Sequence, residues 1–421
     1  MPYTVLRGEF VIRYPDNPRQ GPEPDGDTVK FQPATPALVE TLPRPSGTSP
    51  DLNSRGISVR LEAIDALETH FAETHQEILG AEDARGALLA GLGFTNITYF
   101  PDLPNKVQSA DQDMLPGYVL SNGIDAHGRL IGFVYAGIPA TADGARIFLV
   151  NDGVDSSVNA QLLQAGLVYP AFYGTLPATL RAHLATRSRA ARETRSGIWV
   201  RSIADPDGPA TITDLASLEA KVMWPKLFRR IVPYLAAGHS TFDAFDAWLR
   251  EDPVGRDDTI FRLTLDPPEP GNLHDIITGA GQRIQLTSWP EDFIIAPDPA
   301  PPGTSTGPRT FTAGDLVIVA ALPDPIGADR NAETVSIANP TAAAIDLHGW
   351  KITDTANRSQ DLTGTAGAGD IIRITLTGGM SLGNRGGSIT LTDPHGATID
   401  HANYAETHVK AGQTILFGRT P

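Results

Sequence analysis

The sequence predicts a multidomain, β-rich α+β protein, and three observations support this class. The chain has 421 residues, more than one ordinary hydrophobic core accommodates, so two or three domains are expected. Its 41 glycines and 35 prolines favour turns and short strands over long helices. Alternation of apolar and polar residues dominates the C-terminal part, whereas helical periodicity is confined to the first 250 or so residues.

In the first domain, expected over 1–203, strands and helices alternate along the chain. The apolar pattern predicts strands over 3–13, 28–32, 57–65, 95–100 and 130–136, and helices over 81–92, 158–165 and 177–194. Loops rich in proline, glycine and aspartate are expected over 13–27, 42–56 and 101–117, where both functional rims and plain flexible loops stay open. Together these elements predict strands closing into a small barrel with helices at one end.

A mostly helical middle segment of unknown role is expected over 204–296. Helical periodicity runs through 214–237 and 241–250, and Pro225 and Pro233 should break or bend the first of these helices. The proline-rich run 297–310 then predicts a linker. Beyond it, 311–421 contains short alternating strands separated by turn residues, which predict a β-sandwich.

The charge and the composition exclude several classes of protein. A net charge of −16 argues against a broad electrostatic grip on nucleic acid. One helix, over 177–194 and its flank, is locally basic, either as a solvated face or as a phosphate-contacting one; its arginines are Arg181, Arg187, Arg189, Arg192 and Arg195. The absence of cysteine excludes disulfides, thiolate metal sites and a cysteine nucleophile.

The sequence contains no apolar run long enough to span a membrane. The N-terminus lacks the charged and apolar regions of a secretory signal, and 3–13 instead has the pattern of a strand. We therefore expect a cytoplasmic location by default, while export by a route without an N-terminal signal stays open.

Three short motifs combine carboxylates with arginines near strand ends. The first is Asp25-Gly26-Asp27, the second runs from Arg60 to Glu68 through Asp65, and the third is the turn Asp125-Ala126-His127-Gly128-Arg129. Hydrolysis of a phosphodiester requires such groups: hard oxygen ligands for a divalent metal, arginines for the phosphate oxygens, and a carboxylate for water.

In this order, the three motifs resemble the staphylococcal nuclease (thermonuclease) family. The resemblance continues in the helix and turn over 158–168 and in Ser196-Gly197-Ile198-Trp199, and it covers roughly residues 3 to 200. It implies an oligonucleotide-binding (OB) fold, a five-stranded barrel with helices at one end.

The resemblance also assigns roles to individual residues. It implies Asp27, Asp65 and the carbonyl of Ala66 as metal ligands, Glu68 as the residue beside the attacking water, and Arg60 and Arg129 as phosphate-binding arginines. Asp25 is expected to shape the loop. His127 replaces the tyrosine that the family has before its G-R pair, and Tyr173 lies between the two positions that match the family's later tyrosines. Both are candidate substrate-binding residues.

The expected function is therefore a calcium-dependent nuclease that hydrolyses DNA, RNA or both, leaving 5′-hydroxyl and 3′-phosphate ends as the family does. Mg²⁺ and Mn²⁺ stay open as alternative metals. The alternative function is a non-catalytic module that binds nucleic acid or protein through the barrel.

The C-terminal part resembles a second family, the lamin-tail domain. The resemblance rests on the run Glu333 to Pro340, on Asp346-Leu347-His348-Gly349-Trp350 with Asp354 after it, and on Ile389 to Gly396. It covers roughly 312–418 and implies an immunoglobulin-like β-sandwich that binds a protein or surface partner. Trp350 is expected in its core. In a third interpretation, this partner binding is the main function of the protein.

Overall fold

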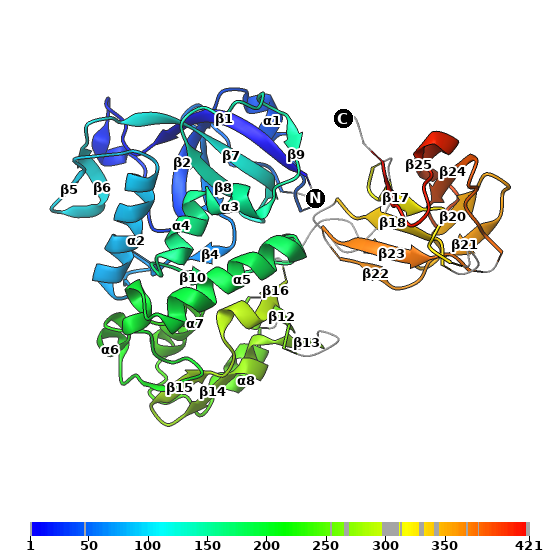
Figure 1. Ribbon diagram of the computed structural model, residues 1–421. Helices are drawn as coiled ribbons and strands as arrows, with labels where there is room; N and C mark the ends of the chain where they lie inside the picture. Colours follow the sequence, from blue (N-terminus) through cyan, green and yellow to red (C-terminus); the bar gives the residue numbers. More distant parts are fainter. Residues whose placement is uncertain are drawn as a thin grey trace. The chain divides into compact units, whose positions relative to one another are not determined.

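A computed structural model describes residues 2–45, 48–252, 255–264, 269–296, 311, 314–327, 332–340, 345–367, 369–377 and 379–417. It confirms the predicted class: a five-stranded closed barrel, a helical middle segment and C-terminal antiparallel sheets (Figure 1). The backbone contacts divide the chain into two compact units, Tyr3–Gly303 and Thr304–Pro421, and Met1–Pro2 belongs with the second. The predicted linker at 297–310 lies outside the described residues.

Five strands form the barrel by pairing in the ring β1–β2–β3–β8–β7–β1. These strands are β1 (Tyr3–Val11), β2 (Thr28–Pro33), β3 (Ile57–Leu61), β7 (Met114–Ile124) and β8 (Leu130–Ala136). Every pair is antiparallel except β3 with β8, which is parallel. A short strand, β9 (Arg146–Ile147), pairs with the start of β1.

Alternating apolar side chains fill the barrel, as its strand pattern requires. Phe10, Phe31 and Phe133 are fully buried, and the rings of Phe10 and Phe31 lie 5.1 Å apart. Helices cover one end and side of the barrel; they are α1 (Pro36–Val39), α2 (Ile78–Gly91), α3 (Asn151–Asp155), α4 (Val158–Gln164) and α5 (Ala178–Glu193). A 3₁₀ turn, η1 (Pro18–Gln20), lies in the first loop.

The loop predicted over 101–117 is wrong, because this stretch holds β6 (Leu103–Ser109) and the start of β7. Pro116 and Gly117 have the pattern of a turn, but Gly117 lies in the strand where the ring of Phe10 crosses it. A Cβ there would be 2.3 Å from a carbon of that ring. The strand predicted over 95–100 becomes β5 (Thr98–Phe100), which pairs with β6 outside the barrel.

The strand predicted over 57–65 is interrupted after β3 and resumes as β4 (Ile64–Asp65). Ala63 between them has a positive φ of 71°, a conformation that turns the chain. As a result, β4 leaves the barrel sheet and pairs with β10 (Tyr169–Pro170).

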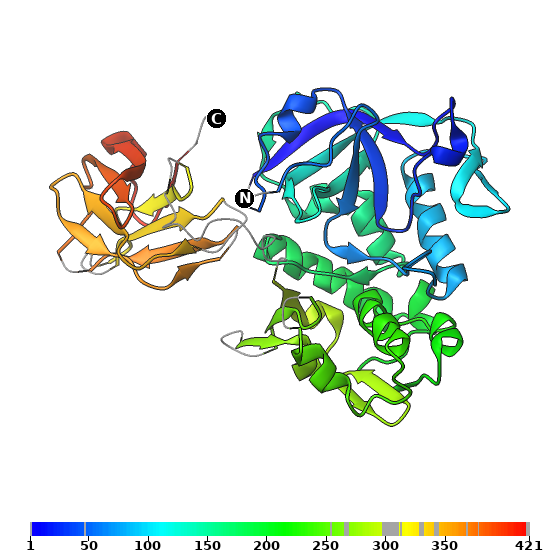
Figure 2. The ribbon, with the colours of Figure 1, turned by 180° about the vertical axis from the view of Figure 1, so that it is seen from behind.

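The middle segment consists of short helices and two three-stranded antiparallel sheets (Figures 1 and 2). One sheet is β11 (Ala210–Thr211), β15 (Arg283–Leu286) and β14 (Ile277–Ala280), and the other is β13 (Glu269–Asn272), β12 (Thr259–Arg262) and β16 (Phe293–Ile295). The helical elements are α6 (Leu215–Glu219), α7 (Pro225–Ala236), α8 (Phe245–Arg250), η3 (Leu273–Ile276) and η4 (Pro290–Asp292), and the 3₁₀ turn η2 (Gly197–Val200) lies just before this segment.

The helix predicted over 214–237 is interrupted before Pro225, as predicted: α6 ends at Glu219, and Pro225 begins α7, where a missing backbone N–H costs nothing. Two other predictions are corrected. Pro233 lies inside α7. The helix predicted over 241–250 is shorter and begins at Phe245.

Barrel and middle segment share a second hydrophobic core. Leu67, Ala81 and Tyr169 from the first 203 residues belong to the same buried cluster as Leu227 and Phe228 of α7. Helix α5 lies between the barrel and the strands β12 and β16 in both ribbon views (Figures 1 and 2). Because this core is continuous, the position of α7 is fixed relative to the end of the barrel.

The C-terminal unit is built from two four-stranded antiparallel sheets around one core. One contains β23 (Ile371–Thr375), β18 (Thr334–Ala338), β17 (Val317–Leu322) and β26 (Ile415–Leu416), and the other β21 (Ser359–Asp361), β20 (Lys351–Asp354), β24 (Gly386–Thr392) and β25 (Thr398–Ala405). A small pair, β19 (Ile345–Asp346) with β22 (Thr365–Ala366), and the turn η5 (Glu406–His408) complete it. Trp350 is fully buried, as predicted.

Across the described residues, no helix is both long enough and apolar enough to pass through a membrane.

Candidate active site

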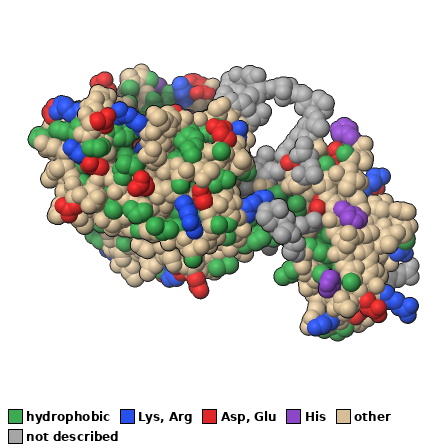
Figure 3. Space-filling view, turned by 90° about the horizontal axis from the view of Figure 1, so that it is seen from above, with side chains coloured by type: hydrophobic (Ala, Val, Ile, Leu, Met, Phe, Trp, Pro, Cys, Tyr) green, Lys and Arg blue, Asp and Glu red, His purple; other side chains and the backbone are tan. Residues whose placement is uncertain are grey.

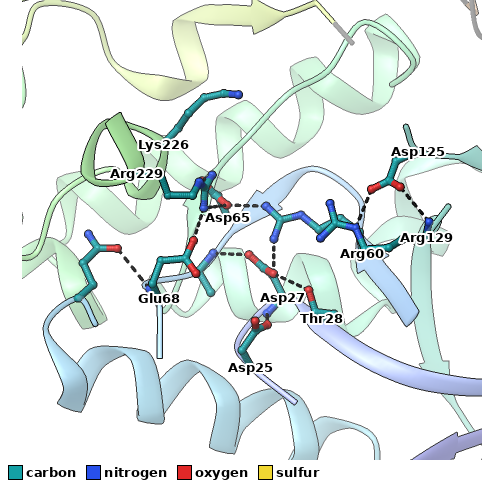
Figure 4. Close-up of polar contacts among 12 residues, drawn as sticks. Asp25, Asp27, Thr28, Arg60, Asp65, Glu68, Asp125, Arg129, Lys226 and Arg229 are labelled. Atoms are coloured by element: carbon teal, nitrogen blue, oxygen red, sulfur yellow. Dashed lines mark hydrogen bonds and ion pairs between the residues drawn. The ribbon is translucent and has the colours of Figure 1, made fainter. Parts of the chain in front are cut away.

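The carboxylates and the arginine of the first two predicted motifs meet where β2 begins and where β3 and β4 end (Figure 4). Asp27 directly precedes β2, Arg60 lies in β3, Asp65 ends β4, and Glu68 follows three residues later. The register of β2 and β3 pairs Thr28 with Arg60, which brings Asp27 beside the arginine. The structure therefore brings these four predicted site residues together.

Gly26 is needed for this arrangement because the loop before β2 approaches β4 and α2 closely. A Cβ on Gly26 would lie 2.5 Å from the Cβ of Ala66 and 2.7 Å from that of Ala84. The close approach lets the amide of Ala66 donate a hydrogen bond of 2.8 Å to Oδ2 of Asp27. The loop is also held by the amide of Asp27, which donates to Oδ1 of Asp25 at 3.1 Å.

The guanidinium of Arg60 bridges the two predicted metal carboxylates. Its Nη1 forms an ion pair with Oδ1 of Asp27, and its Nη2 donates to Oδ1 of Asp65 at 2.5 Å. Asp27 and Asp65 are almost completely buried, at 3% and 1% exposure. The two buried carboxylates thus converge on one cation.

A second cation, Arg229 of α7, completes the cluster, and sequence reasoning did not identify it. Its Nη1 and Nη2 donate to the two oxygens of Asp65 at 3.2 and 2.8 Å, and Nη1 also pairs with Oε1 of Glu68. Figure 4 shows this guanidinium facing Asp65 and Glu68. The helical pattern of α7 is visible in the sequence, but nothing in it points to a barrel site about 160 residues earlier.

Glu68 is held through its backbone as well as its side chain. Its amide donates to Oε1 of Gln76 at 3.3 Å, and the amide of Gln76 donates to the carbonyl of Glu68 at 2.9 Å. The buried side chain of Gln76 in turn donates to the carbonyl of Met223, two residues before α7, at 2.6 Å. The loop that carries Glu68 is therefore tied to the middle segment.

Burial and charge act in opposite directions on the carboxylates. Burial opposes ionisation of Asp65, but the guanidinium groups of Arg229 and Arg60 outweigh it and lower its pKa. Burial raises the pKa of Glu68, against the pull of Arg229. The pKa of Asp25 is raised well above its usual value by burial and by the charges of Asp27 and Glu68. Four carboxylates share two arginines, and the raised pKa values of Asp25 and Glu68 show that ionising all four together is unfavourable.

Arg129, predicted as the second phosphate-binding arginine, lies just before the strand that pairs with that of Arg60, and outside the carboxylate cluster. It directly precedes β8, whose residue Ile131 is the register partner of Arg60. Its backbone amide and its Nε donate to Asp125 at 2.8 and 2.7 Å. His127 is exposed in the same turn, and its amide also donates to Asp125, at 2.9 Å.

Tyr173, the other predicted substrate residue, follows β10 and is half-buried. Burial opposes the charge of Arg60, but Asp27, Asp65 and, after them, Tyr173 outweigh burial and raise the pKa of that arginine. The amino group of Lys226 of α7 lies 5.9 Å from the centre of the Tyr173 ring. Tyr173 therefore borders the cluster from the side of the middle segment.

The donor set agrees chemically with a divalent cation of low ligand count. No group of three or more histidine or acidic side chains suited to a metal ion occurs within the part of the chain that the structure describes. Two buried carboxylates do converge on the guanidinium of Arg60, which occupies the place of a cation between Asp27 and Asp65. Such a pair, with the carbonyl of Ala66 and water, offers the hard oxygen donors that Ca²⁺ prefers.

The basic helix α5 uses its arginines mainly for internal ion pairs. Arg187 pairs with Asp155 at 2.6 Å, and Arg192 pairs with the buried Glu291 at 2.9 Å while lying over the ring of Trp289. On the face seen in Figure 3, basic and acidic side chains of the described residues are interspersed, without a continuous basic stripe.

No protein-family model matches this sequence, and no curated protein resembles it closely enough to indicate a relationship. The OB-like barrel and the geometry of the carboxylate–arginine cluster therefore carry the functional argument.

Proposed function

We propose that this protein is a metal-dependent phosphodiesterase that hydrolyses DNA or RNA at the cluster of Asp27, Arg60, Asp65 and Glu68. The observation that carries the proposal is the convergence of two buried carboxylates on Arg60, with a third carboxylate, Glu68, beside them. An excess of buried carboxylates over arginines at the end of an OB-like barrel is costly for the fold, so it favours a functional explanation.

Arg60 and Arg129 are the proposed ligands of the scissile phosphate. Arg60 lies in β3, and Arg129 directly precedes β8, the neighbouring parallel strand; Arg60 is paired with Asp27 and Asp65, and Arg129 with Asp125. A guanidinium presents paired N–H donors that match two phosphate oxygens. Charge that develops on those oxygens during attack would be stabilised by both groups.

Glu68 is the proposed base that orients or deprotonates the attacking water. Its carboxylate is mostly buried, and its backbone is fixed on both sides by Gln76. A carboxylate whose pKa is raised by burial is a better proton acceptor than an exposed one.

Asp27, Asp65 and the carbonyl of Ala66 would hold a divalent cation, with Ca²⁺ proposed and Mg²⁺ or Mn²⁺ as alternatives. A bound cation would supply charge neutralisation at the phosphate. With only two carboxylates, the site should bind Ca²⁺ weakly, nearer to the affinity of extracellular modules than to that of cytosolic sensors.

The test is incubation of the pure full-length protein with single-stranded DNA, duplex DNA and RNA, in Ca²⁺, Mg²⁺, Mn²⁺ or chelator. We expect cleavage with metal and none in chelator, and analysis of the product ends would show which bond breaks. Binding of the same substrates without cleavage under every condition would instead favour a non-catalytic binding module.

For the C-terminal unit we propose attachment to a partner or to the substrate's surroundings. It is a β-sandwich with its own core, separate from the unit that holds the cluster. Removing 304–421 should leave cleavage of short oligonucleotides unchanged and slow the processing of long or immobilised DNA. Equal loss on both substrates would mean that this unit completes the active site.

A further inference from the structure

Arg229 belongs to the middle segment, yet it makes as many ion pairs with the carboxylate cluster as Arg60 does. The resemblance covers only the first two hundred residues and assigns no role to this arginine. Its position therefore raises the question of what the middle segment adds to the site.

The helix that carries Arg229 is fixed in place. Leu227, Phe228 and Ile231 on α7 have no exposed surface, and they pack in the core shared with Leu67. The ring of Phe228 also meets that of Phe71, in the loop after Glu68, with the ring centres 6.3 Å apart. Because α7 packs on the same core as the loop of Glu68, Arg229 is held at the site by the fold.

Arg60 and Arg229 aim at one oxygen atom. Oδ1 of Asp65 accepts from Nη2 of Arg60 at 2.5 Å and from Nη1 of Arg229 at 3.2 Å. Two like charges so close together are unfavourable unless an anion lies between them. The two arginines therefore concentrate positive charge around the carboxylate of Asp65.

Two of the five N–H donors of Arg229 are not used in the carboxylate cluster. A guanidinium has five N–H groups, and three of those of Arg229 are used, two on Asp65 and one on Glu68. Among the described residues, its Nε–H and its second Nη2–H have no hydrogen-bond partner. These two lie on the same edge of the guanidinium, the edge that binds an oxyanion through two parallel hydrogen bonds. The side chain is 19% exposed, so part of it faces solvent.

We propose that Arg229 is a third phosphate-binding arginine, which holds a substrate phosphate with its free edge while its other edge fixes Asp65 and Glu68. The proposal rests on the proposed function for the nature of the substrate, a chain of phosphodiesters. In this proposal, the middle segment supplies one wall of the substrate site.

Arg230, the next residue of α7, provides a matched control. Its side chain is 18% exposed and pairs with Asp258 at 2.6 Å, away from Asp65 and Glu68. Arg229→Gln and Arg230→Gln therefore remove the same group, at the same burial, from the same helix. Arg229→Lys keeps the charge and removes the paired donors.

The experiment is titration calorimetry of the full-length protein with deoxyadenosine 3′,5′-bisphosphate in the presence of Ca²⁺. This probe carries two phosphates and no diester to cleave, so binding is measured apart from hydrolysis. We expect the affinity to fall about 10- to 100-fold in Arg229→Gln, to fall less in Arg229→Lys, and to stay unchanged in Arg230→Gln.

Unchanged affinity in Arg229→Gln, or no binding of the probe by the wild type, overturns the proposal. If Arg229→Gln does not fold, then Arg229→Lys decides, and wild-type affinity in that variant overturns the proposal as well. Cleavage of an oligonucleotide is assayed in parallel. Loss of probe binding in Arg229→Gln together with a wild type that cleaves nothing refutes the proposed function and leaves Arg229 as a phosphate ligand.

Discussion

Two neighbouring arginines of α7, Arg229 and Arg230, belong to two different ionic clusters. Cations outnumber carboxylates in the cluster of Arg230, and carboxylates outnumber cations in that of Arg229. Arg230 and Lys226 share one buried carboxylate, Asp258, whose pKa they lower against the effect of burial. Arg229 instead enters a cluster in which carboxylates outnumber cations and the pKa of Asp25 is raised well above its usual value. The first cluster has every carboxylate satisfied, which is what a structural ion pair needs. In the second, carboxylates outnumber cations and the pKa values of two of them are raised, which supports the proposal that this cluster binds a cation.

The largest expected effect is on kcat, which should depend on the Arg229 cluster and not on the Arg230 cluster. Glu68→Gln keeps the shape of the side chain and its contact region but removes the base, so kcat should fall about 10²- to 10⁴-fold with little change in KM. Asp258→Asn should leave kcat within a few-fold of wild type in protein that remains folded. Steady-state cleavage of a labelled oligonucleotide gives both values. If KM rises in Glu68→Gln while kcat holds, then Glu68 binds substrate and is not the base.

The second effect is on the free energy of unfolding, which should depend more on the Arg230 cluster than on the Arg229 cluster. Asp258→Asn leaves Lys226 and Arg230 buried without their counter-charge, which should cost on the order of 3–5 kcal/mol of unfolding free energy. Urea unfolding followed by tryptophan fluorescence measures it. A loss below about 1 kcal/mol would mean that this cluster is as dispensable as an exposed ion pair.

A third effect concerns pH and a buried acid that belongs to neither cluster. Glu62 is 2% exposed, and its Oε2 has no hydrogen-bond partner among the described residues; burial raises its pKa from 4.5 to about 7. Between these two values the folded protein holds a proton that the unfolded chain has released. The contribution of Glu62 to stability should therefore fall as pH rises, by roughly 1.4 kcal/mol per pH unit between about 4.5 and 7, and level off above.

Glu62→Gln is the control for this pH dependence. The uncharged amide should remove that component of the slope and make the variant relatively more stable at pH 8 than at pH 5, compared with wild type. Parallel slopes of the two proteins in urea unfolding between pH 5 and 8 would contradict the account.

The smallest effect tests the excess of carboxylates directly. Asp25→Asn keeps an oxygen for the amide of Asp27 and removes a charge that burial and the neighbouring carboxylates oppose, so it should stabilise the fold by on the order of 1 kcal/mol near pH 7. The same type of substitution thus has opposite signs at Asp25 and Asp258. A destabilised Asp25→Asn would show that the site is balanced in the free protein.

The site residues that the barrel provides could be predicted from the sequence, but Arg229 of α7 could not. Asp27, Arg60, Asp65 and Glu68 were identified because their short motifs, in this order, resemble a known family, and the pairing of β2 with β3 brings Asp27 beside Arg60. Arg229 is brought to Asp65 by the tertiary packing of a core that spans two segments, and no local pattern encodes such packing. β7 was missed for a related reason: its Gly117 is required by the ring of Phe10, a contact across strands, while the local pattern of Pro116-Gly117 is that of a turn.

The most direct test of the central claim is cleavage of a short single-stranded DNA by the full-length protein as Ca²⁺ is titrated, beside Asp65→Ala. Asp65 is the carboxylate on which both arginines converge and one of only two that would hold the cation. We predict cleavage that rises with Ca²⁺, stops in chelator, and is lost at every Ca²⁺ concentration in folded Asp65→Ala protein. Cleavage that persists in chelator, or in Asp65→Ala, would contradict the account.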